Sequence, residues 1–250
     1  MKKTNGGQKL LNISNVSKTY GNNTVKAVDN ISLEVKSGQI LGFIGPNGAG
    51  KTTTMKMITG ILKPDAGIIT IGGHSITEKP LAAKQSFGYV PDSPDMFLRL
   101  KGMEYLNFMA DMYEVDDTIR REKITAMAQT FEMTGALSAR IQSYSHGMRQ
   151  KIIIMGALMH DPAVWILDEP LTGLDPRSSF QLKEMMRQHA QTGKCVLFST
   201  HMLEVAEKLC DKIALINKGR IVFFGELEEL KAMHNQLSLE DIFMEVTANA

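Results

Sequence analysis

Short apolar runs of strand length fill the first part of the chain. Turn residues such as Asn22-Asn23 and Ser37-Gly38 separate them, as is typical of closely spaced β-strands. The pattern predicts an antiparallel β layer near the start of the chain. The strands indicated are residues 11–16, 25–28, 31–35, 40–44, 67–72 and 87–90.

The pattern becomes helical between about residues 100 and 160, where apolar side chains such as Met103 and Leu106 recur at helix spacing. Strands and helices then alternate again, and two short helices are predicted at the end, over 226–234 and 239–245. This order predicts an α/β core that carries an inserted helical subdomain. The later elements are strands at 163–168, 195–199, 212–216 and 220–224, and helices at 178–190 and 202–209.

A glycine-rich segment links the apolar strand at 40–44 to a helix, and it matches the phosphate-loop pattern G-x-x-x-x-G-K-[ST] in its required context. Glycines let backbone N–H groups surround phosphates, and the helix N-terminus adds a positive dipole. We expect Lys51 to reach the β- and γ-phosphates and the Thr52 hydroxyl to bind Mg²⁺. The sequence therefore predicts a P-loop core that binds a nucleoside triphosphate. The segment comprises Gly45, Pro46, Asn47, Gly48, Ala49, Gly50, Lys51, Thr52 and Thr53.

A second candidate site follows the apolar run Val164 to Leu167, which ends in Asp168 and Glu169. A buried strand that stops in two acids places both carboxylates at the sheet edge where phosphate-binding loops open. Asp168 then suits Mg²⁺, and Glu169 can polarise a water for attack on the γ-phosphate. The alternative, that the pair only ends a strand before the Pro170 turn, is weakened by the upstream phosphate loop.

Ser145 and Gly147 stand at the start of the apolar helix predicted around 152–159. A serine and a glycine there are ordinary helix-capping residues. The same hydroxyl and free N–H groups also suit a second anion site. The residues alone leave both readings open.

The composition of the chain limits the kinds of molecule and environment expected for it. The 250 residues include 28 basic and 27 acidic side chains, so no field for general nucleic-acid binding is expected. The N-terminus lacks the apolar segment of a signal peptide, and the longest apolar stretch is far shorter than the roughly 20 residues that span a bilayer. Two cysteines cannot form a disulfide framework, which fits a reducing cytoplasm.

The order of these motifs resembles the ABC ATPase family over residues 10–246. The phosphate loop matches Walker A, 164–169 matches Walker B with its catalytic glutamate, and Ser145-His146-Gly147-Met148 stands at the family's signature. By this resemblance, Leu174-Asp175 corresponds to the D-loop. The resemblance further implies that Tyr20 stacks on adenine and that His201 is the switch histidine that contacts the γ-phosphate.

Two positions depart from the family pattern. Asp92 stands where the family usually has the glutamine that senses Mg²⁺; an aspartate can bind Mg²⁺ or water but cannot donate a hydrogen bond as an amide does. His146 and Met148 replace a glycine and a glutamine of the signature. Ser145 and Gly147, which the resemblance assigns to phosphate contact, are retained, so a working site is expected.

The resemblance also implies an assembly and a place in the cell. Two such domains dimerise head to tail and clamp each ATP between one Walker A loop and the other signature serine, so this chain pairs with itself or with a second ABC ATPase. A membrane permease subunit is the implied partner, contacted near 92–100 and 103–113, at the cytoplasmic face of the membrane. The implied single domain comprises a catalytic core (about 10–91 and 161–225), a helical subdomain (about 92–160) and C-terminal helices (about 226–250).

The leading interpretation is the ATP-hydrolysing subunit of an ABC transporter. Val90-Pro91-Asp92, the signature and the segment 239–243 resemble export-type bacterial members, and no added C-terminal regulatory domain is expected. One alternative is a soluble ABC ATPase acting on ribosomes or DNA, although the chain has neither a second nucleotide domain nor a long coiled-coil insertion. Another is a regulatory module that holds ATP without hydrolysis, which Lys51, Asp168, Glu169 and His201 oppose.

Overall fold

A six-stranded sheet forms the centre of the computed structural model, which describes residues 7–21, 25–234 and 237–248. Five neighbouring strands run parallel, and the edge strand β10 runs antiparallel to β9. Three of the parallel strands, β3, β7 and β8, are buried along their whole length, because helices cover both faces of the sheet. The order is β10 (Arg220–Gly225), β9 (Lys212–Asn217), β3 (Ile40–Ile44), β8 (Cys195–Thr200), β7 (Val164–Asp168) and β6 (Phe87–Val90).

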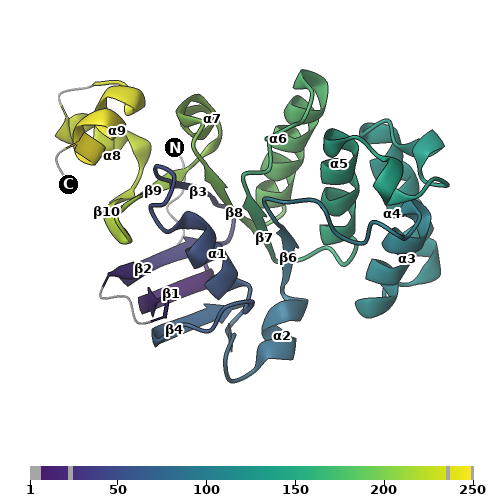
Figure 1. Ribbon diagram of the computed structural model, residues 1–250, viewed down its shortest axis with the longest axis horizontal. Helices are drawn as coiled ribbons and strands as arrows, with labels where there is room; N and C mark the ends of the chain where they lie inside the picture. Colours follow the sequence, from purple (N-terminus) through teal and green to yellow (C-terminus); the bar gives the residue numbers. More distant parts are fainter. Residues whose placement is uncertain (1–6, 22–24, 235–236, 249–250) are drawn as a thin grey trace.

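Alternation along these strands divides the core into two large apolar clusters. Val196 and Phe198 of β8 belong to the cluster shared with the helical part of the chain, whereas Cys195 and Leu197 belong to the cluster shared with the β layer. The helix α1 (Lys51–Ile58) contributes Met55 and Met57 to the second cluster and lies between the sheet and the β layer (Figure 1). Cys195 is a buried free thiol in this second cluster.

The antiparallel layer contains four strands in the order β2, β1, β4, β5, and the predicted layer near the chain start is confirmed. One prediction was wrong: the two strands predicted at 25–28 and 31–35 are one strand, β2, which begins at Lys26. Asn30 and Asn15 take left-handed backbone angles where the register shifts, so the strand bends without ending. The predicted Asn22-Asn23 turn lies outside the described residues. The strands are β1 (Lys9–Thr19), β2 (Lys26–Lys36), β4 (Ala66–Ile71) and β5 (His74–Ser75).

Three helices pack together beside the β6 edge of the sheet (Figure 1). They are α3 (Gly102–Met112), α4 (Asp117–Thr130) and α5 (His146–Ala157), with short 3₁₀ turns η1 (Thr134–Ala136) and η2 (Ile141–Ser143) between α4 and α5. The ring of Tyr105 lies so close to Gly156 that any larger residue there would collide with it. The three helices confirm the helical segment that the sequence predicts between about residues 100 and 160. The short helix α2 (Pro80–Gln85) was missed, because six residues show little periodicity.

The remaining helices complete the α/β alternation. The helices α6 (Pro176–Gln191) and α7 (Leu203–Leu209) lie on the face of the sheet opposite α1 (Figure 1). The predicted C-terminal pair is observed as α8 (Leu227–Met233) and α9 (Leu239–Ala248), and Leu230 and Ile242 pack in a third apolar cluster with α7. Within the described ranges, no helix combines the length and the apolar character needed to cross a membrane.

Candidate functional site: a nucleotide cavity at the sheet edge

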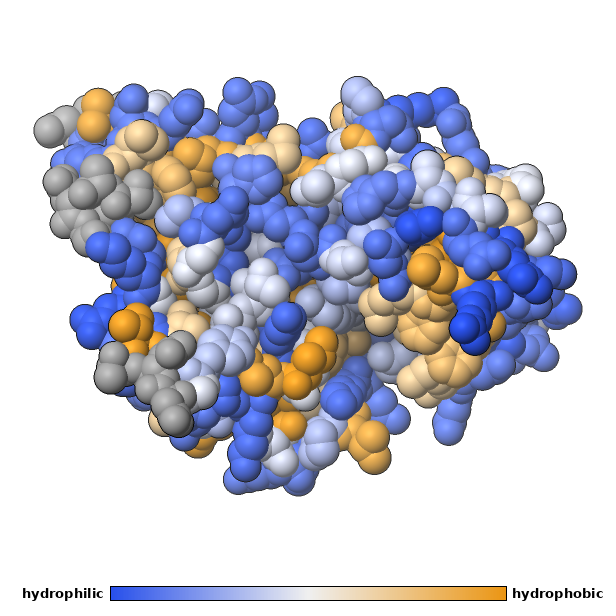
Figure 2. Space-filling model, in the orientation of Figure 1, coloured by the Kyte–Doolittle hydropathy of each residue, from blue (hydrophilic) through white to orange (hydrophobic). Residues whose placement is uncertain are grey.

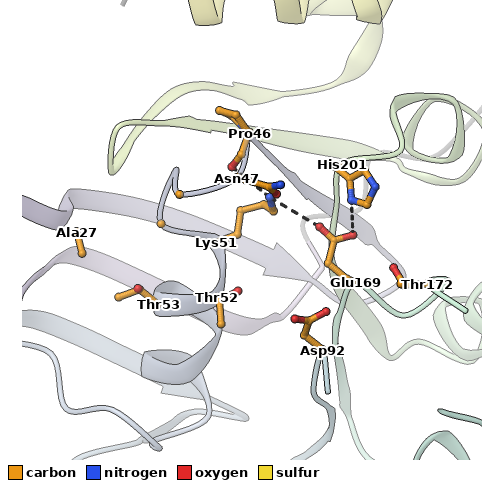
Figure 3. Close-up of a pocket in the computed structure, with 12 residues that line it drawn as sticks. Ala27, Pro46, Asn47, Lys51, Thr52, Thr53, Asp92, Glu169, Thr172 and His201 are labelled. Carbon is orange, nitrogen blue, oxygen red and sulfur yellow. Dashed lines mark hydrogen bonds and ion pairs between the residues drawn. The ribbon is translucent and has the colours of Figure 1, made fainter. Parts of the chain in front are cut away.

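A cavity of about 360 Å³ opens where β3 runs into α1, beside the end of β7 (Figure 3). The carboxyl ends of parallel strands meet at this edge, so loops from distant parts of the sequence converge there. The cavity therefore brings together the phosphate loop and the residues after β6, β7 and β8. Its lining consists of Ala27, Pro46, Asn47, Gly48, Gly50, Lys51, Thr52, Thr53, Asp92, Glu169, Thr172 and His201.

The phosphate loop depends on the backbone freedom of Gly50, which has a φ of 108° and occupies the N-cap position of α1. A β-carbon on Gly50 would lie only 2.6 Å from the Ala27 carbonyl oxygen, so only glycine fits. The side chain of Lys51 is buried, and its Nζ donates to the carbonyl oxygens of Gly45 at 2.7 Å and Pro46 at 3.3 Å. These contacts hold the ammonium group across the loop.

Glu169 lies between a lysine and a histidine. Its carboxylate lies 3.7 Å from Lys51 Nζ and 2.9 Å from His201 Nδ1 (Figure 3). The backbone φ of Glu169 is +48°, an unusual value for a non-glycine residue, and its N–H donates to Ser199 Oγ at 3.0 Å. The backbone therefore holds the Glu169 carboxylate at the cavity wall.

Asp168 is fully buried directly before Glu169. Its Oδ1 accepts a hydrogen bond from Ser199 Oγ, whereas Oδ2 has no hydrogen-bond partner among the described residues. Burial raises the pKa of Asp168, and the nearby carboxylates of Asp92 and Glu169 raise it further. A buried oxygen that lacks a partner is poised for a cation.

The donor set fits Mg²⁺ that arrives with a nucleotide. No cluster of three or more His, Cys, Asp or Glu side chains able to hold a metal occurs in the described part of the chain. Mg²⁺ commonly uses one or two carboxylates and completes its shell with phosphate oxygens and water. Thr52 and Asp92 line the cavity, and the buried Asp168 directly precedes Glu169 in the cavity wall.

The predicted adenine-stacking residue, Tyr20, lies beside the phosphate loop but not in the cavity lining. Its side chain is 43% exposed, and its hydroxyl shares a 3.3 Å hydrogen bond with Thr53 Oγ1. The ring thus has an accessible face at the outer side of the loop. Ala49 faces inward instead: it is buried in the core, and its carbonyl accepts from Gly219 N–H at 2.9 Å.

Ser145 and Gly147 lie apart from this cavity. Ser145 is exposed at the N-cap of α5, where its Oγ accepts from Met148 N–H at 3.3 Å. A β-carbon on Gly147 would come within 2.7 Å of the Gly173 carbonyl oxygen, and the exposed His146 ring covers the open side of Gly173. The structure therefore joins the signature segment to the D-loop segment of the same chain, and it leaves the Ser145 hydroxyl at the surface.

Three residues of the site were absent from the sequence analysis. Ser199 bridges Asp168 and Glu169, and a polar residue at the end of an apolar strand was an available signal for it. Thr172 and Ala27 line the cavity, but neither belongs to a recognisable motif. Ala27 approaches the phosphate loop from the antiparallel layer, a contact that only the packing of the two layers creates.

Several known proteins are similar to this chain. The family model described as "ABC transporter" matches residues 28–172. The ABC transporter ATP-binding protein NatA of Bacillus subtilis is 35% identical over 221 residues, which is 88% of this chain and 90% of that protein. The Bacillus subtilis protein EcsA, an ABC-type transporter ATP-binding protein, is 34% identical over 95% of this chain and 96% of its own length. The Nod factor export ATP-binding protein I of Cupriavidus metallidurans is 34% identical over 88% of this chain and 72% of that protein.

Solved structures show the same fold. An ATP-binding subunit of an ABC transporter superposes with a TM-score of 0.90 at 30% identity, covering 94% of this chain and 98% of that one. A dimeric ATP-binding cassette bound to ADP and Pi superposes with a TM-score of 0.78 at 22% identity, over 87% of this chain and 98% of that one. The chain therefore belongs to the ABC transporter family, in which it is an ATP-binding subunit and an ATPase.

Proposed function

We propose that this chain hydrolyses Mg-ATP between two head-to-tail subunits and thereby energises a membrane permease that exports its substrate. The observation that carries the proposal is the convergence of Lys51, Asp92, Glu169 and His201 on one cavity beside the phosphate loop. These residues come from four separate segments of the chain, namely the start of α1 and the residues after β6, β7 and β8. Their convergence suits in-line attack of a water on a phosphate held by the loop.

Each residue has a role that follows from its contacts. Lys51, held by two loop carbonyls, neutralises the β- and γ-phosphates. Glu169 accepts a proton from the attacking water, and the His201 imidazole, 2.9 Å from the Glu169 carboxylate, orients that carboxylate and contacts the γ-phosphate. With Glu169 in place, Lys51 has a carboxylate partner before ATP binds, so the cation is never left alone in a buried site.

Mg²⁺ would be held by Thr52 and Asp168, with Asp92 close enough to act directly or through water. When bound with ATP, Mg²⁺ would neutralise charge that develops on the phosphates. Asp92 lacks the amide donor of the usual glutamine, so we propose that it acts only as an acceptor. Tyr20 would stack on the adenine from the outer side of the phosphate loop.

The exposed position of Ser145 supports a composite site. Ser145 and Gly147 lie outside the cavity of their own chain, yet their hydroxyl and N–H groups are open at a helix N-terminus. A second copy, or a second ABC ATPase, would present this segment to the γ-phosphate. Shared binding of that charge would hold two subunits together until hydrolysis removes it.

An apolar groove supports the permease as the partner. It measures about 630 Å³ and is lined by Asp95, Phe97, Leu98, Arg99, Leu100 and Phe108. Apolar surface gathers over α3 in the space-filling view (Figure 2). The residues that line the groove begin shortly after Asp92 in sequence. A movement of the proposed helical lobe (about 92–160) would therefore shift both Asp92 at the nucleotide cavity and the groove that contacts the partner. A permease partner would place the chain at the cytoplasmic face of the membrane.

Export is proposed from the relatives. The printed names of two relatives refer to Nod factor export and to linearmycin resistance. The first name states a direction of transport, and the second states resistance to a compound. Because both relatives are similar to this chain over most of its length, we propose export as the direction of its transport.

The proposal is tested with Glu169→Gln. The amide keeps the shape of the side chain but cannot take the proton, so ATP turnover should fall about 10²- to 10⁴-fold while Mg-ATP still binds. ATP should then convert the variant to a stable dimer, seen as a doubled mass in light scattering. Glu122→Gln, an exposed acid on α4, should behave like the parent. A Glu169→Gln variant that turns over ATP at the parent rate would contradict the assignment.

A further inference from the structure

The backbone that carries Glu169 has an unusual conformation. The φ of Glu169 is +48°, its carbonyl accepts from Thr172 N–H at 3.2 Å, and the next residue is Pro170. Residues other than glycine rarely take positive φ values, and a proline further restricts the backbone of the residue before it. A backbone of this kind persists only where the surrounding contacts hold it. The contacts that hold this segment therefore determine where the Glu169 carboxylate lies.

The first of these contacts comes from the sheet. Ser199 of β8 is fully buried and lies directly opposite Asp168 of β7. Its Oγ accepts from Glu169 N–H at 3.0 Å and donates to Asp168 Oδ1 at 2.5 Å. A serine hydroxyl has a single hydrogen, so these two bonds use its donor and one of its acceptor positions. One side chain thus fixes the Glu169 backbone relative to the Asp168 carboxylate.

The second contact comes from the signature helix α5. The side chain of Gln150 is buried, with 1% of it exposed, and its Nε2 donates to the Pro170 carbonyl at 3.3 Å. Its Oε1 has no hydrogen-bond partner among the described residues. An apolar side chain of similar shape would avoid the cost of a buried oxygen without a partner. The contact with Pro170 therefore explains this amide better than a contribution to stability does.

Two further contacts fix α5 against the loop after β7. Lys151 Nζ lies 3.1 Å from the Asp175 carboxylate, where the loop ends. In the middle of the loop, a β-carbon on Gly147 would lie only 2.7 Å from the Gly173 carbonyl oxygen. The helix is therefore a fixed support for the loop, and Gln150 extends this support to its first residues.

We propose that Gln150 and Ser199 are positioning residues for the ATPase reaction, which hold the Glu169 backbone so that its carboxylate stays beside Lys51 and His201 (Figure 3). Neither Gln150 nor Ser199 is among the described residues that line the nucleotide cavity, so both act through Glu169 and not by contact with the nucleotide. The inference rests on the proposed role of Glu169 as the base. A displacement of about 1 Å at a reacting group can lower a rate about 100-fold, so loss of one contact affects turnover more than binding.

Gln150→Met tests the contact from α5, because methionine keeps the length of the side chain but cannot donate to the Pro170 carbonyl. Steady-state turnover should fall about tenfold, while the dissociation constant for Mg-ATP, measured by calorimetry, stays within about twofold of the parent value. The control is Ile153→Val, which loses buried packing in the same helix but keeps the hydrogen bond and should hydrolyse ATP like the parent. An equal loss of turnover in Ile153→Val would show that any weakening of α5 has this effect, and would overturn the proposal.

Ser199 variants test the contact from the sheet. Ser199→Ala removes the hydroxyl and should lower turnover at least as much as Gln150→Met, because the Asp168 carboxylate also loses a partner. Ser199→Thr keeps the hydroxyl and should retain most of the turnover. Melting temperatures measured for all variants show that each is folded. Parent-like turnover in Ser199→Ala would contradict the role of Ser199.

Combining Gln150→Met with Glu169→Gln determines whether Gln150 acts through the base. Once the carboxylate is absent its position no longer matters, so Gln150→Met should not further lower the single-turnover rate of Glu169→Gln. An additional loss of about tenfold in the double variant, or parent-like turnover in Gln150→Met alone, overturns the proposal but leaves the role of Glu169 intact. Parent-like turnover in Glu169→Gln alone contradicts the proposed function, and this inference with it.

Discussion

At the scale of residues, the nucleotide site is a set of buried or half-buried charges that contact one another before any nucleotide binds. Lys51 and Glu169 are 3.7 Å apart, and the Asp168 carboxylate has one oxygen without a partner. Buried charges of this kind are costly for stability unless they are paired. The site therefore holds groups that a phosphate and a cation would satisfy better than the protein alone does.

Lys51 should be essential for nucleotide binding. Lys51→Ala removes the ammonium group held by the Gly45 and Pro46 carbonyls, and ATP affinity should fall about 100-fold or more. Isothermal titration with ATP measures the change. The control is Lys56→Ala, which removes an exposed lysine from the same helix α1 and should bind ATP normally. Equal ATP affinity in Lys51→Ala and the parent would rule out the proposed role of the loop lysine.

The buried carboxyl of Asp168 should destabilise the nucleotide-free protein at neutral pH. Its raised pKa means that the folded state binds a proton more readily than the unfolded state, so stability falls as pH rises from the ordinary pKa to the raised one. Asp168→Asn removes this charge and should stabilise the protein by about 1 kcal/mol, or about 2–4 °C in Tm, at pH 7.

Melting curves recorded with a chelator and without nucleotide test this expectation. The gain in Tm should shrink as pH is lowered toward the ordinary range of an aspartate, because the parent carboxyl is then protonated in both states. Mg-dependent ATP turnover should be lost in the same variant. If the Tm of Asp168→Asn at pH 7 is equal to or lower than that of the parent, the folded protein already stabilises the ionised Asp168 carboxylate, and the expectation is wrong.

At the scale of elements, two helix N-termini bring the signature and the D-loop together. Asp175 caps α6 by accepting from Ser178, and Lys151 of α5 lies 3.1 Å from the Asp175 carboxylate. These contacts lower the pKa of Asp175, with the Ser178 hydrogen bonds as the main cause. Together with the close approach of His146 to Gly173, they fix the N-termini of α5 and α6 against each other.

A bulky cation at the α5 N-terminus should block the composite site. Ser145→Arg should leave ATP binding to the monomer near the parent value but reduce turnover about 100-fold, because in the proposed composite site the changed residue would face the nucleotide of the other subunit. Paired measurements of ATP affinity and steady-state hydrolysis give the result. Ser145→Asn keeps a helix-capping side chain but lacks the hydroxyl, so it separates the capping role from the proposed phosphate contact. Ser138→Arg, at an exposed serine in the same helical part, is the control. Normal turnover in Ser145→Arg would return Ser145 to a purely structural role.

At the scale of the whole molecule, the helical part and the core share one continuous apolar cluster, which includes Leu106 of α3 and Phe198 of β8. The groove at Phe97 and Phe108 lies at the surface of the helical part, with these two ring centroids 5.8 Å apart. Phe108 is 42% exposed. Exposed aromatic groups in an apolar groove are typical of a protein interface.

The groove should bind the permease. Phe108→Asp should weaken association with the cognate permease about tenfold or more, while basal ATP turnover stays near that of the parent, because the changed residue lies outside the nucleotide cavity. Co-purification of the permease from detergent-solubilised membranes of the source organism measures this association. Leu81→Asp, at an exposed leucine on α2, provides the matched control. Undiminished recovery of the permease with Phe108→Asp would place the interface elsewhere.

Most elements of the fold could be predicted because each one carries a local signal. Strands β3, β7 and β8 begin with apolar runs, and the helices after residue 100 show a clear period. Two kinds of element could not be read in this way. The six-residue helix α2 is too short to show a period, and β2 continues through a polar bend at Asn30 that looks like a turn in sequence.

The sequence by itself determined the P-loop fold class and the candidate chemistry, because the phosphate loop and the Asp168-Glu169 pair are contiguous motifs whose residue types dictate what they can bind. Only the tertiary structure decided which distant residues meet. It brings Asp92, Glu169 and His201 to the Lys51 cavity and leaves Ser145 outside it, and it places Ser199 between the two acids. The physical reason is the parallel sheet: its carboxyl edge gathers loops that are far apart in sequence, and no local pattern encodes that convergence.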